Sequence, residues 1–448
     1  MNNLRPCVFA LSLYTAISTT SGAFGQTNEL PRHAVIGLQV APANLDKPED
    51  PVTNPATIKV VAAGGAGEAA GLQAGDVLVA LDDMPVTTAG DFAHRISRHL
   101  AGDSVTIGIL RQRAPMSITV MLKPRPYETS SDAEIVYTSV SLNGAYRRVI
   151  ITRPKTSGRH PGVLLIGGLG CYSLDGELTR PTGYGPIVSA LVKNAFVTMR
   201  VEKTGEGDSN GPACTDPKAT AELEARGYVA GLRLLKTYDF VDPTHVFIFA
   251  HSLGPLVASL VVTQEPVHGL VAAETIGRSW YEYSLENVRR QSALIGEPFD
   301  QVDAEVRAHA ICASHFFLQH EPADDVSKLG EQCADMIRSY AGMPSLYMQQ
   351  IGDLSLAKQW KSADIPVLVI YGTSDPATSA DESRYLVEII NSFHPGRASY
   401  VELPGMGHDF ARYDSQLEFL TRRKEPNKPH PYDDEVVAVV LKWLNEHF

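Results

Sequence analysis

The pattern of apolar and polar positions changes character along the chain. An N-terminal part contains short alternating runs, interrupted by glycine and turn residues, of the kind that form half-buried strands. These runs cover residues 33–40, 57–62, 76–81, 104–111 and 116–122. The remainder contains fully apolar runs that alternate with helical patterns. Apolar runs separated by helices predict a parallel sheet that is buried on both faces.

A short proline-containing segment separates the two parts. Residues 123–126 read Lys-Pro-Arg-Pro, and because proline has no amide hydrogen it ends a strand ladder and stiffens the connection. We therefore predict a small β-rich domain over residues 32–124. An α/β domain with a mostly parallel sheet is predicted over residues 127–448.

The first residues have the pattern of an export signal. Arg5 precedes an apolar stretch over residues 7–17, and Ala23 and Gly25 are small residues suited to a cleavage site after Gly25. Residues 1–25 are therefore predicted to be a signal peptide, and the mature protein to be periplasmic or secreted. A short core element is the alternative interpretation of the same residues.

Four cysteines remain after that cleavage: Cys171, Cys214, Cys312 and Cys333. An even number in an exported protein permits two disulfides in three possible pairings, and four buried thiols are the alternative. No pair has the spacing of a thiol-redox motif or a zinc site, and His315 and His320 do not share a helical face. We predict no metal and no other cofactor.

Composition and charge narrow the function classes. Hydrophobic residues make up 44% and charged residues 20% of the chain, which is ordinary for a globular protein and excludes a disordered or coiled-coil chain. The 51 acidic and 39 basic residues give a formal net charge of -12, the wrong sign for binding a nucleic-acid backbone. Beyond the N-terminus, no apolar run approaches the ~20 residues of a membrane span.

A glycine-rich segment of the first part fits the dinucleotide-binding fingerprint. Residues 65–70 read Gly-Ala-Gly-Glu-Ala-Ala after a predicted strand. The fingerprint requires a long helix to follow, and Gly71 and Gly75 leave no room for one. We therefore reject a nucleotide site here.

The longer segment over residues 64–84, followed by a helical pattern at 87–100, resembles the PDZ domains of bacterial periplasmic proteases. PDZ domains bind extended peptides, usually C-terminal ones, by adding a strand to a sheet edge. The resemblance implies that residues 33–40 supply this edge. It also implies that the amides of Val35-Ile36-Gly37-Leu38 hold the peptide carboxylate. A PDZ-shaped spacer that binds nothing is the alternative.

A candidate nucleophile follows one of the buried apolar runs. Residues 246–250 (VFIFA) precede Ser252, and a helical pattern covers residues 256–263. Strand, sharp turn and helix form the context of a nucleophile elbow, where only small residues fit beside the strained serine. Ala250 and Gly254 occupy the neighbouring positions, so the segment reads A-x-S-x-G rather than G-x-S-x-G.

A base and a carboxylate follow later predicted strands. Asp375 comes after the apolar run 365–371, and His408 comes after a further short strand. Parallel sheets gather the residues that follow their strands at one edge, and the order Ser252, Asp375, His408 is that of α/β-hydrolases. We predict that His408 takes the serine proton while Asp375 fixes the imidazole tautomer. Asp381 is the alternative acid.

The transition state also needs hydrogen-bond donors for its oxyanion. The glycine-rich turn 167–171 follows an apolar run, at the place where α/β-hydrolases carry one such donor. Matched to that family, the amides of Leu169 and Leu253 form the oxyanion hole, with Gly168 and Gly170 as neighbouring alternatives to Leu169.

Two further segments extend the resemblance. Residues 202–209 resemble a loop of the α/β-hydrolases related to prolyl oligopeptidase and dienelactone hydrolase, with Glu202 in place of the usual aspartate, and we interpret this loop as structural. In that fold, Cys171 and Cys214 follow neighbouring strands, so a bridge between them would brace the oxyanion turn. Residues 277–362 are predicted to form a helical cap rich in aromatic residues, at a place where α/β-hydrolases often enclose part of the substrate. Packing within the cap explains the same aromatic residues equally well.

The sequence thus predicts an exported α/β-hydrolase with an N-terminal PDZ domain and a serine-dependent activity on carboxylic esters or related acyl bonds. One alternative is a peptidase of the prolyl oligopeptidase type that captures peptides with its PDZ domain. The other is a PDZ-based binding protein whose hydrolase domain is silent. The expected partners are a small-molecule ester or peptide substrate and a protein C-terminal peptide, and neither nucleic acid nor a membrane span is expected.

Overall fold

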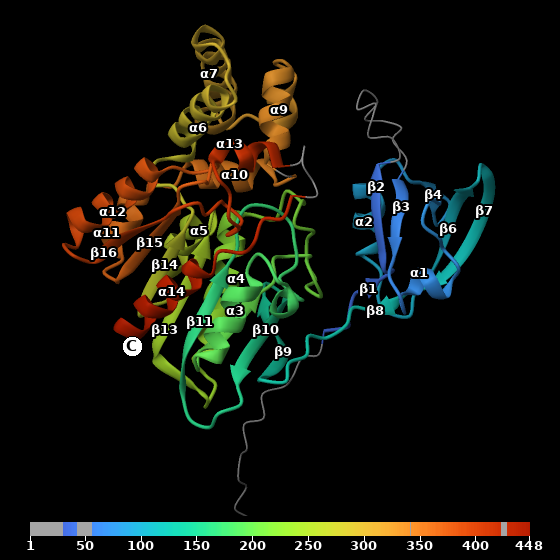
Figure 1. Ribbon diagram of the computed structural model, residues 1–448, viewed down its shortest axis with the longest axis horizontal. Helices are drawn as coiled ribbons and strands as arrows, with labels where there is room; N and C mark the ends of the chain where they lie inside the picture. The colour runs from blue at the N-terminus through green and yellow to red at the C-terminus, as the bar shows by residue number, and fades with distance from the viewer. Residues whose placement is uncertain (1–29, 43–55, 341, 423–427) are drawn as a thin grey trace, which may run out of the picture.

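The structure is a computed structural model that describes residues 30–42, 56–340, 342–422 and 428–448. The predicted signal peptide, residues 1–25, lies outside these ranges. The described chain forms a small β-rich domain and a larger α/β domain, joined by a short connection (Figure 1). In the described part, no helix combines the length and the apolar character needed to cross a bilayer.

The small domain is built on a strongly bent antiparallel sheet with strand order β2-β3-β4-β6-β7. Its core gathers alternate residues of these strands, including Leu78 and Ile107, around Phe92 of the amphipathic helix α2. The elements are β1 Ala34–Val35, β2 Leu38–Pro42, β3 Ala56–Val61, α1 Ala66–Ala69, β4 Val77–Leu81, β5 Met84–Pro85, α2 Ala89–Ile96, β6 Ser104–Arg111, β7 Ala114–Met121 and β8 Lys123–Pro124.

Two local predictions for this domain were wrong in detail. Residues 33–40 do not form one strand, because Gly37 has φ +74° and turns the chain between β1 and β2. The prolines after residue 122 do not end all pairing either. Pro124 lies in β8, which pairs with β1, and its missing amide costs no bond at this two-residue edge.

The large domain is built on an eight-stranded sheet with order β16-β15-β14-β13-β11-β12-β10-β9. Only β9 and β10 run antiparallel to their neighbours, and the other strands are parallel. The strand order reverses beside β11, so the crevice at the carboxyl ends of β11 and β13 is where such a sheet binds ligands. The strands are β9 Ala133–Leu142, β10 Ala145–Pro154, β11 His160–Ile166, β12 Val197–Val201, β13 Val241–His251, β14 Gly269–Ala273, β15 Val367–Gly372 and β16 Ala398–Leu403.

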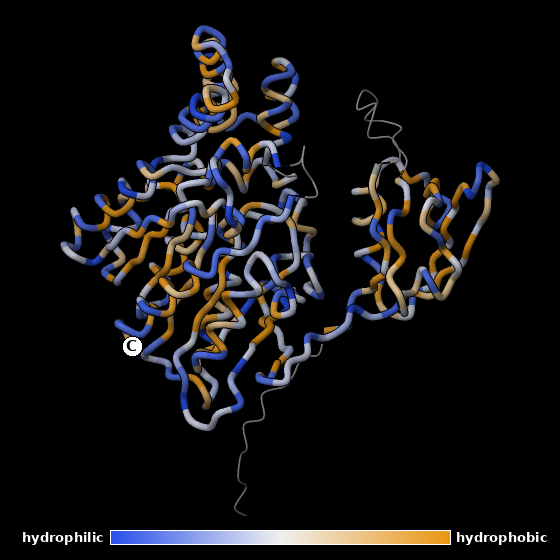
Figure 2. Tube along the Cα trace, viewed as in Figure 1, coloured by the Kyte–Doolittle hydropathy of each residue, from blue (hydrophilic) through white to orange (hydrophobic). Residues whose placement is uncertain are grey.

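Helices cover both faces of this sheet, which explains why its central strands are apolar throughout (Figure 2). Helices α4, α5, α11 and α12 pack on one face, and α3 and α14 pack on the other. Their bounds are α3 Gly185–Lys193, α4 Ala221–Leu235, α5 Gly254–Val262, α11 Leu356–Ser362, α12 Ala380–Phe393 and α14 Asp434–Glu446.

A helical cap stands between β14 and β15, at the top of Figure 1. Its helices are α6 Trp280–Leu294, α7 Phe299–Ala313, α8 Ala323–Ser327, α9 Glu331–Ser339 and α10 Ser345–Gly352. Within the predicted range 277–362, the last helix, α11, packs beside α5 and α12 and so belongs to the layer that covers the sheet.

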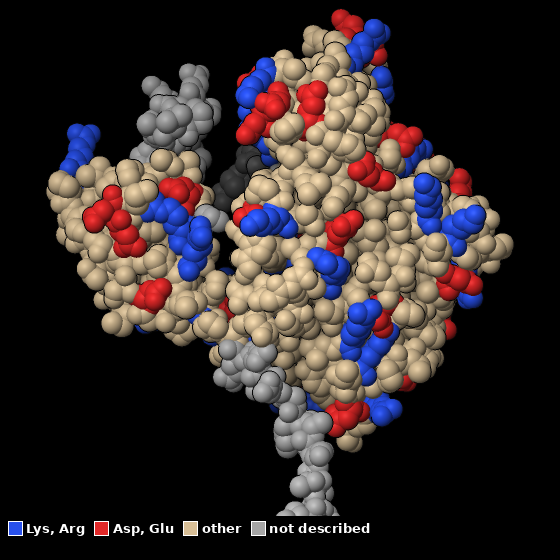
Figure 3. Space-filling model, turned by 180° about the vertical axis from the view of Figure 1, so that it is seen from behind, with Lys and Arg blue, Asp and Glu red and all other residues tan. Residues whose placement is uncertain are grey.

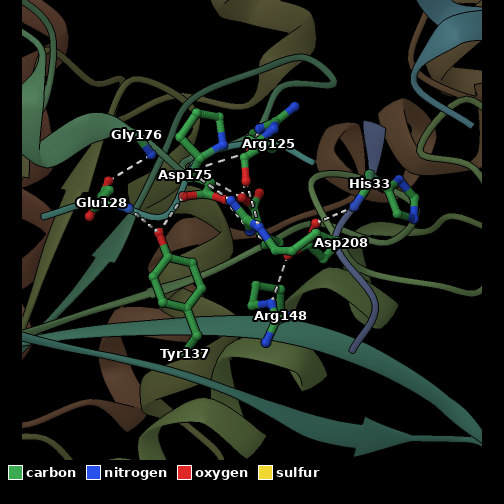
Figure 4. A network of polar contacts seen from close by, with 12 residues as sticks. His33, Arg125, Glu128, Tyr137, Arg148, Asp175, Gly176 and Asp208 are labelled. Carbon is green, nitrogen blue, oxygen red and sulfur yellow. Dashed lines mark hydrogen bonds and ion pairs between the residues drawn. The ribbon is translucent and has the colours of Figure 1, made fainter. Parts of the chain in front are cut away.

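The two domains are tied together by a buried polar network at the connection (Figure 4). Arg32, which immediately precedes the small domain, is buried and donates to Asp175 at 2.6 Å and to Asp208. Its guanidinium also donates to the carbonyls of Arg125 and Pro126, which follow β8. One side chain therefore joins the start and the end of the small domain to two loops of the large one.

Charged side chains of both signs are interspersed over the face seen in Figure 3. On this view, acidic and basic groups lie next to one another on both domains and on the cap. Exposed pairs of opposite charge on one helix, such as Arg307 with Asp303 on α7, occur in the described chain. Such exposed pairs contribute little to stability, because water and salt screen their charges.

Candidate active site

Ser252 occupies a sharp turn between β13 and α5. Its φ is +60°, a region that non-glycine residues rarely adopt, and its amide donates to the carbonyl of Ala273 at 2.9 Å. The turn passes so close to β11 that small residues are required around it. A Cβ on Gly254 would come within 2.6 Å of the Ile166 carbonyl, and one on Gly168 within 2.9 Å of the Ser252 Cβ.

The structure brings the three predicted triad residues together. The Ser252 hydroxyl donates to Nε2 of His408 at 3.0 Å, and Nδ1 of His408 donates to Oδ2 of Asp375 at 2.9 Å. Asp375 is held in turn by the Thr378 hydroxyl and the Ala377 amide, each at 2.6 Å. This is the hydrogen-bond chain of a nucleophile, a base and an orienting carboxylate.

Burial and the His408–Asp375 pair set the protonation states. Burial alone would raise the pKa of Asp375, but the neighbouring His408 charge and hydrogen bond lower it well below its usual value. Burial likewise lowers the pKa of His408, but the Asp375 carboxylate outweighs this and raises it above the usual value. Asp375 is therefore ionised, and its charge favours the protonated form of the His408 ring.

Asp381, the alternative acid, does not reach this site. It lies in the first turn of α12, its side chain is 82% exposed, and it pairs with Arg384 on the same helix. The residue that caps this helix is Ser379, four residues beyond Asp375.

The glycine-rich turn after β11 lies against the serine turn. Lys203, which is buried, donates to the carbonyls of Gly168 and Gly170 at 2.9 and 3.0 Å, and the Gly168 amide donates to the Tyr184 hydroxyl. The amides of Leu169 and Leu253 donate to no described group. Among the alternatives for the first oxyanion donor, the Gly168 amide is thus already engaged, whereas the amides of Leu169 and Gly170 both donate to no described group.

His251 is a neighbour of the triad that the sequence analysis did not single out. Its Nε2 donates to the His408 carbonyl at 2.9 Å, because a carbonyl can only accept, and its Nδ1 therefore accepts from the Tyr184 hydroxyl. Burial, and then the neighbouring His408, lower the pKa of His251 to about 3. This neutral imidazole ties the His408 loop to the oxyanion turn. Its adjacency to Ser252 was the only sequence signal for it.

A cavity of about 680 Å³ lies between the serine turn and the cap. Ser252 and His408 line it from the catalytic side. Trp280 and Tyr283 of α6, together with Tyr340 after α9, line it with aromatic rings. Aromatic rings of the cap thus line part of this cavity, whereas Phe316, Phe317 and Tyr347 are buried and do not line it.

The charged side chains that line this cavity are all acidic. No lysine or arginine is among the described residues that line it, whereas Glu305 and Asp335 are. Asp335 is paired with Arg338 on the exposed side of α9. Glu305 accepts a hydrogen bond from Ser292 at 2.6 Å and forms no ion pair with a described residue. A substrate bound here meets a negative rather than a positive wall.

Two family models match the sequence. One describes the PDZ domain and matches residues 34–122, and the other describes the alpha/beta hydrolase family and matches residues 163–421, more than half of the chain. The protein belongs to the alpha/beta hydrolase family. The small domain of this hydrolase is accordingly a PDZ domain, which confirms the predicted fold class.

Solved structures similar to this hydrolase include two whose sequences are distant. Est1E from Butyrivibrio proteoclasticus is 16% identical, with 66% of this chain and 97% of that chain covered and a TM-score of 0.41. The Pyrococcus furiosus esterase Pf2001 is 13% identical, with 72% and 96% covered and a TM-score of 0.44. No curated protein matches the hydrolase sequence.

Both predicted disulfides are present, and the structure selects one of the three pairings. Cys171 pairs with Cys214, and Cys312 pairs with Cys333. The first bridge joins the oxyanion turn to the loop after β12, where the resemblance placed it. The second lies within the cap.

Glu202 begins the loop after β12 and has the structural role predicted for it. It is buried and accepts hydrogen bonds from the Ser173 hydroxyl at 2.6 Å and from the amides of Leu174 and Asp175. Burial raises the pKa of Glu202 to about 7. The carboxyl thus organises the segment that follows the oxyanion turn and does not reach the cavity.

The predicted peptide loop of the PDZ domain is shorter than four residues. Val35 belongs to β1 and Leu38 begins β2, so only Ile36 and Gly37 lie between strands. The carbonyls of Ile36 and Gly37 accept from the amides of Gly67 and Ala62, both at 2.8 Å, whereas their own amides donate to no described group. Among the described strands, β2 is the edge of its sheet, and α2 packs beside it.

Proposed function

We propose that this hydrolase cleaves a carboxylic ester or a related acyl bond with Ser252 as nucleophile. The observation that carries the proposal is the hydrogen-bond chain from Ser252 through His408 to Asp375, next to the amides of Leu169 and Leu253 and a cavity of about 680 Å³. A serine in this setting is activated by its base, and water attacks the acyl group only after the leaving group has departed.

The reaction proceeds in two halves. His408 Nε2 takes the Ser252 proton as Oγ bonds to the carbonyl carbon, and the oxyanion accepts from the amides of Leu169 and Leu253. The carbon–oxygen bond to the alcohol then breaks, and His408 gives the proton to the leaving oxygen. A water molecule attacks the acyl-enzyme by the same route, which releases the acid and returns the proton to Ser252. Asp375 stays ionised throughout and stabilises the imidazolium.

A fluorophosphonate probe tests the nucleophile directly. Intact mass should show one adduct on the wild-type protein and none on Ser252→Ala, because the probe reacts only with an activated serine. Ser252→Ala should also abolish ester hydrolysis, with an unfolding temperature close to that of the wild type. Labelling of a folded Ser252→Ala variant, or none on the wild type, would contradict the assignment and favour a silent hydrolase domain.

The charge of the cavity favours an ester over the peptidase alternative. A peptidase that takes substrates with a free C-terminus close to the scissile bond needs a cation for that carboxylate, and none lines the described cavity. The hydrogen-bond chain from Ser252 to Asp375 supports the serine mechanism equally in both cases. An ester and an amide of the same acyl group, compared by kcat/KM, distinguish the two, and faster turnover of the amide would support the peptidase.

We propose further that the PDZ domain binds a C-terminal peptide along β2. The edge position of β2 and the free amides of Ile36 and Gly37 support this, since they offer main-chain partners for a strand and a carboxylate. Fluorescence anisotropy with a labelled apolar peptide should show binding that is lost when its C-terminus is amidated. Equal binding of both forms, or of neither, would favour the spacer interpretation.

Export to an oxidising compartment is also proposed, and both disulfides support it. The protein recovered from its native compartment should begin at Gln26, and its denatured form should contain no free thiol. Four free thiols, or an intact residue 1–25 segment in the mature protein, would place it in a reducing compartment.

A further inference from the structure

Glu274 is a fully buried carboxyl group at the edge of the catalytic site. It follows β14 directly, with φ +50° and its amide donating to the Ile370 carbonyl at 2.9 Å. One of its carboxyl oxygens lies within 4.8 Å of an Asp375 oxygen and of a His408 ring nitrogen, and these two also lie within 4.8 Å of each other. Neither the sequence pattern nor the triad chemistry described above uses this residue.

Burial and the charge of Asp375 act on the Glu274 carboxyl more strongly than its two neighbouring donors, the Gly372 amide and the Thr378 hydroxyl, which lower its pKa. Neither of its oxygens has a hydrogen-bond partner among the described residues. The Thr378 hydroxyl nearby gives its hydrogen to Asp375, and the Tyr371 hydroxyl gives its own to the Asp375 carbonyl. A buried ionised carboxylate that these donors do not compensate is strongly unfavourable, so the group keeps its proton.

Two carboxyl groups this close do not both ionise. Burial, and then the charge of Asp375, raise the pKa of Glu274 well above its usual value, whereas the His408 contact lowers that of Asp375. Asp375 is therefore the ionised member and Glu274 the neutral one. The titratable groups facing Glu274 are Asp375, His408 and Tyr371, and no lysine or arginine of the described chain pairs with it.

We propose that Glu274 is a positioning residue that donates its carboxyl proton in a hydrogen bond to Asp375 and so holds that carboxylate against His408 Nδ1. The proposal rests on the proposed serine mechanism. With this bond, Asp375 accepts from Glu274 as well as from the His408 ring, the Thr378 hydroxyl and the Ala377 amide. The neutral state of Glu274 also keeps a second negative charge away from the imidazole.

Two substitutions separate this role from simple filling of space. Glu274→Gln keeps the size and supplies an amide donor, so kcat should stay within about threefold of the wild type. Glu274→Ala removes the donor, so kcat should fall by about tenfold or more with KM nearly unchanged, as expected for one lost hydrogen bond to a charged group. Equal kcat values for the two variants would overturn the proposal.

A spectroscopic measurement tests the proton itself without relying on activity. At neutral pH, where exposed carboxyls are ionised, infrared difference spectra should contain a protonated carboxyl band that Glu274→Gln lacks. The matched control is Glu382→Gln, because Glu382 is equally buried but accepts from the Gly277 and Arg278 amides and from the Arg278 side chain. That variant should keep the band although it loses an ion pair. Glu202, whose pKa burial raises to about 7, contributes a band of its own at this pH, so the test is the wild-type-minus-variant difference. A difference spectrum in which Glu274→Gln loses no protonated carboxyl band would refute the protonated state.

The outcomes also separate this proposal from the serine mechanism. If Ser252 is not labelled by a fluorophosphonate and no ester is hydrolysed, the proposed function fails whatever the infrared spectra show. If Ser252 reacts but Glu274→Ala turns over as fast as Glu274→Gln, only the role of Glu274 fails.

Discussion

At the scale of single residues, the site depends on side chains that are held in unusual states. Ser252 adopts a left-handed backbone conformation, which costs on the order of 1–3 kcal/mol. The close approach of Gly168 and Gly254 makes that turn possible, and the sheet bond from its amide to Ala273 holds it in place. The hydroxyl therefore stands free of the strand and reaches His408.

Asp375 should be the acid on which the rate depends. Replacing it with asparagine should lower kcat by about four orders of magnitude, because an amide cannot hold the required tautomer of His408 or stabilise its charged form. Asp381→Asn is the matched control, since that side chain is exposed on α12, and its kcat should stay within about twofold of the wild type. Steady-state kinetics on an aryl ester measures both. A large loss in the control and none at Asp375 would exchange the two assignments.

The pH dependence of kcat/KM should report His408. The value of kcat/KM should rise with pH as His408 loses its proton. The midpoint of this rise should lie above the usual imidazole pKa of ~6.5, because the Asp375 charge outweighs the effect of burial on the pKa of His408. In Asp375→Asn the charge is gone and burial remains, so the midpoint should move to lower pH. The residual kcat/KM of Asp375→Asn, measured from acid to neutral pH, shows whether the midpoint moves to lower or to higher pH. An unchanged midpoint would mean that another group controls the profile.

At the scale of elements, the segment behind the oxyanion turn is fastened from several sides. Glu128, which is paired with the buried Arg200, accepts from the amides of Gly176 and Leu178, and Glu202 accepts from the preceding amides. Asp175 in the same segment accepts from Arg32 and from the Tyr137 hydroxyl (Figure 4). The connection to the PDZ domain thus helps to hold the segment that follows the oxyanion turn in place.

Arg32→Met should weaken this support. The change leaves Asp175 and Asp208 buried with one cation fewer, which should cost about 3 kcal/mol of stability and free the connection between the domains. We expect a lower unfolding temperature and faster proteolysis at residues 123–126. Lys59→Met, on the exposed side of β3, is a control that removes the same charge without these contacts. Equal effects of both variants would show that the network does not hold the domains together.

At the scale of the whole molecule, acidic side chains outnumber basic ones on the cap, although the two signs are interspersed there. Residues 277–340 of the cap carry eleven acidic and six basic side chains, a large share of the formal net charge of -12. The cavity below it shares this sign, because Glu305 and Asp335 line it and no described lysine or arginine does. Long-range attraction and the local wall therefore act in the same direction on a charged substrate.

Esters that differ only in a terminal charge should show the effect of these acidic side chains on substrate binding. Among three aryl esters of equal length that end in an ammonium, a neutral or a carboxylate group, the carboxylate should have the lowest kcat/KM, by about tenfold relative to the ammonium at low salt. The difference should shrink in Glu305→Gln and at high ionic strength. Asp303→Asn, on the exposed side of α7, is the control and should change little. Fastest turnover of the carboxylate would favour the peptidase alternative instead.

Local patterns were sufficient for much of this picture. Strand-like runs followed by turns predicted where Ser252, Asp375 and His408 stand, because parallel strands deliver their carboxyl ends to one edge of the sheet. Boundaries were less well predicted. Gly37 divides the expected edge strand, and α2 is shorter than the helical pattern at 87–100, because Thr88 caps it and tertiary packing decides where a helix ends.

The sequence by itself determined the division into two domains, the α/β fold and the order of the nucleophile, acid and base, because these depend on periodicity and on residues that follow strands. Only the tertiary structure decided which groups meet across long separations. It buried Arg32 between two aspartates, set Glu274 beside Asp375 and placed His251 between Tyr184 and the His408 carbonyl. Contacts between residues that are distant in the sequence leave no local pattern, since burial and proximity arise only when distant elements pack together.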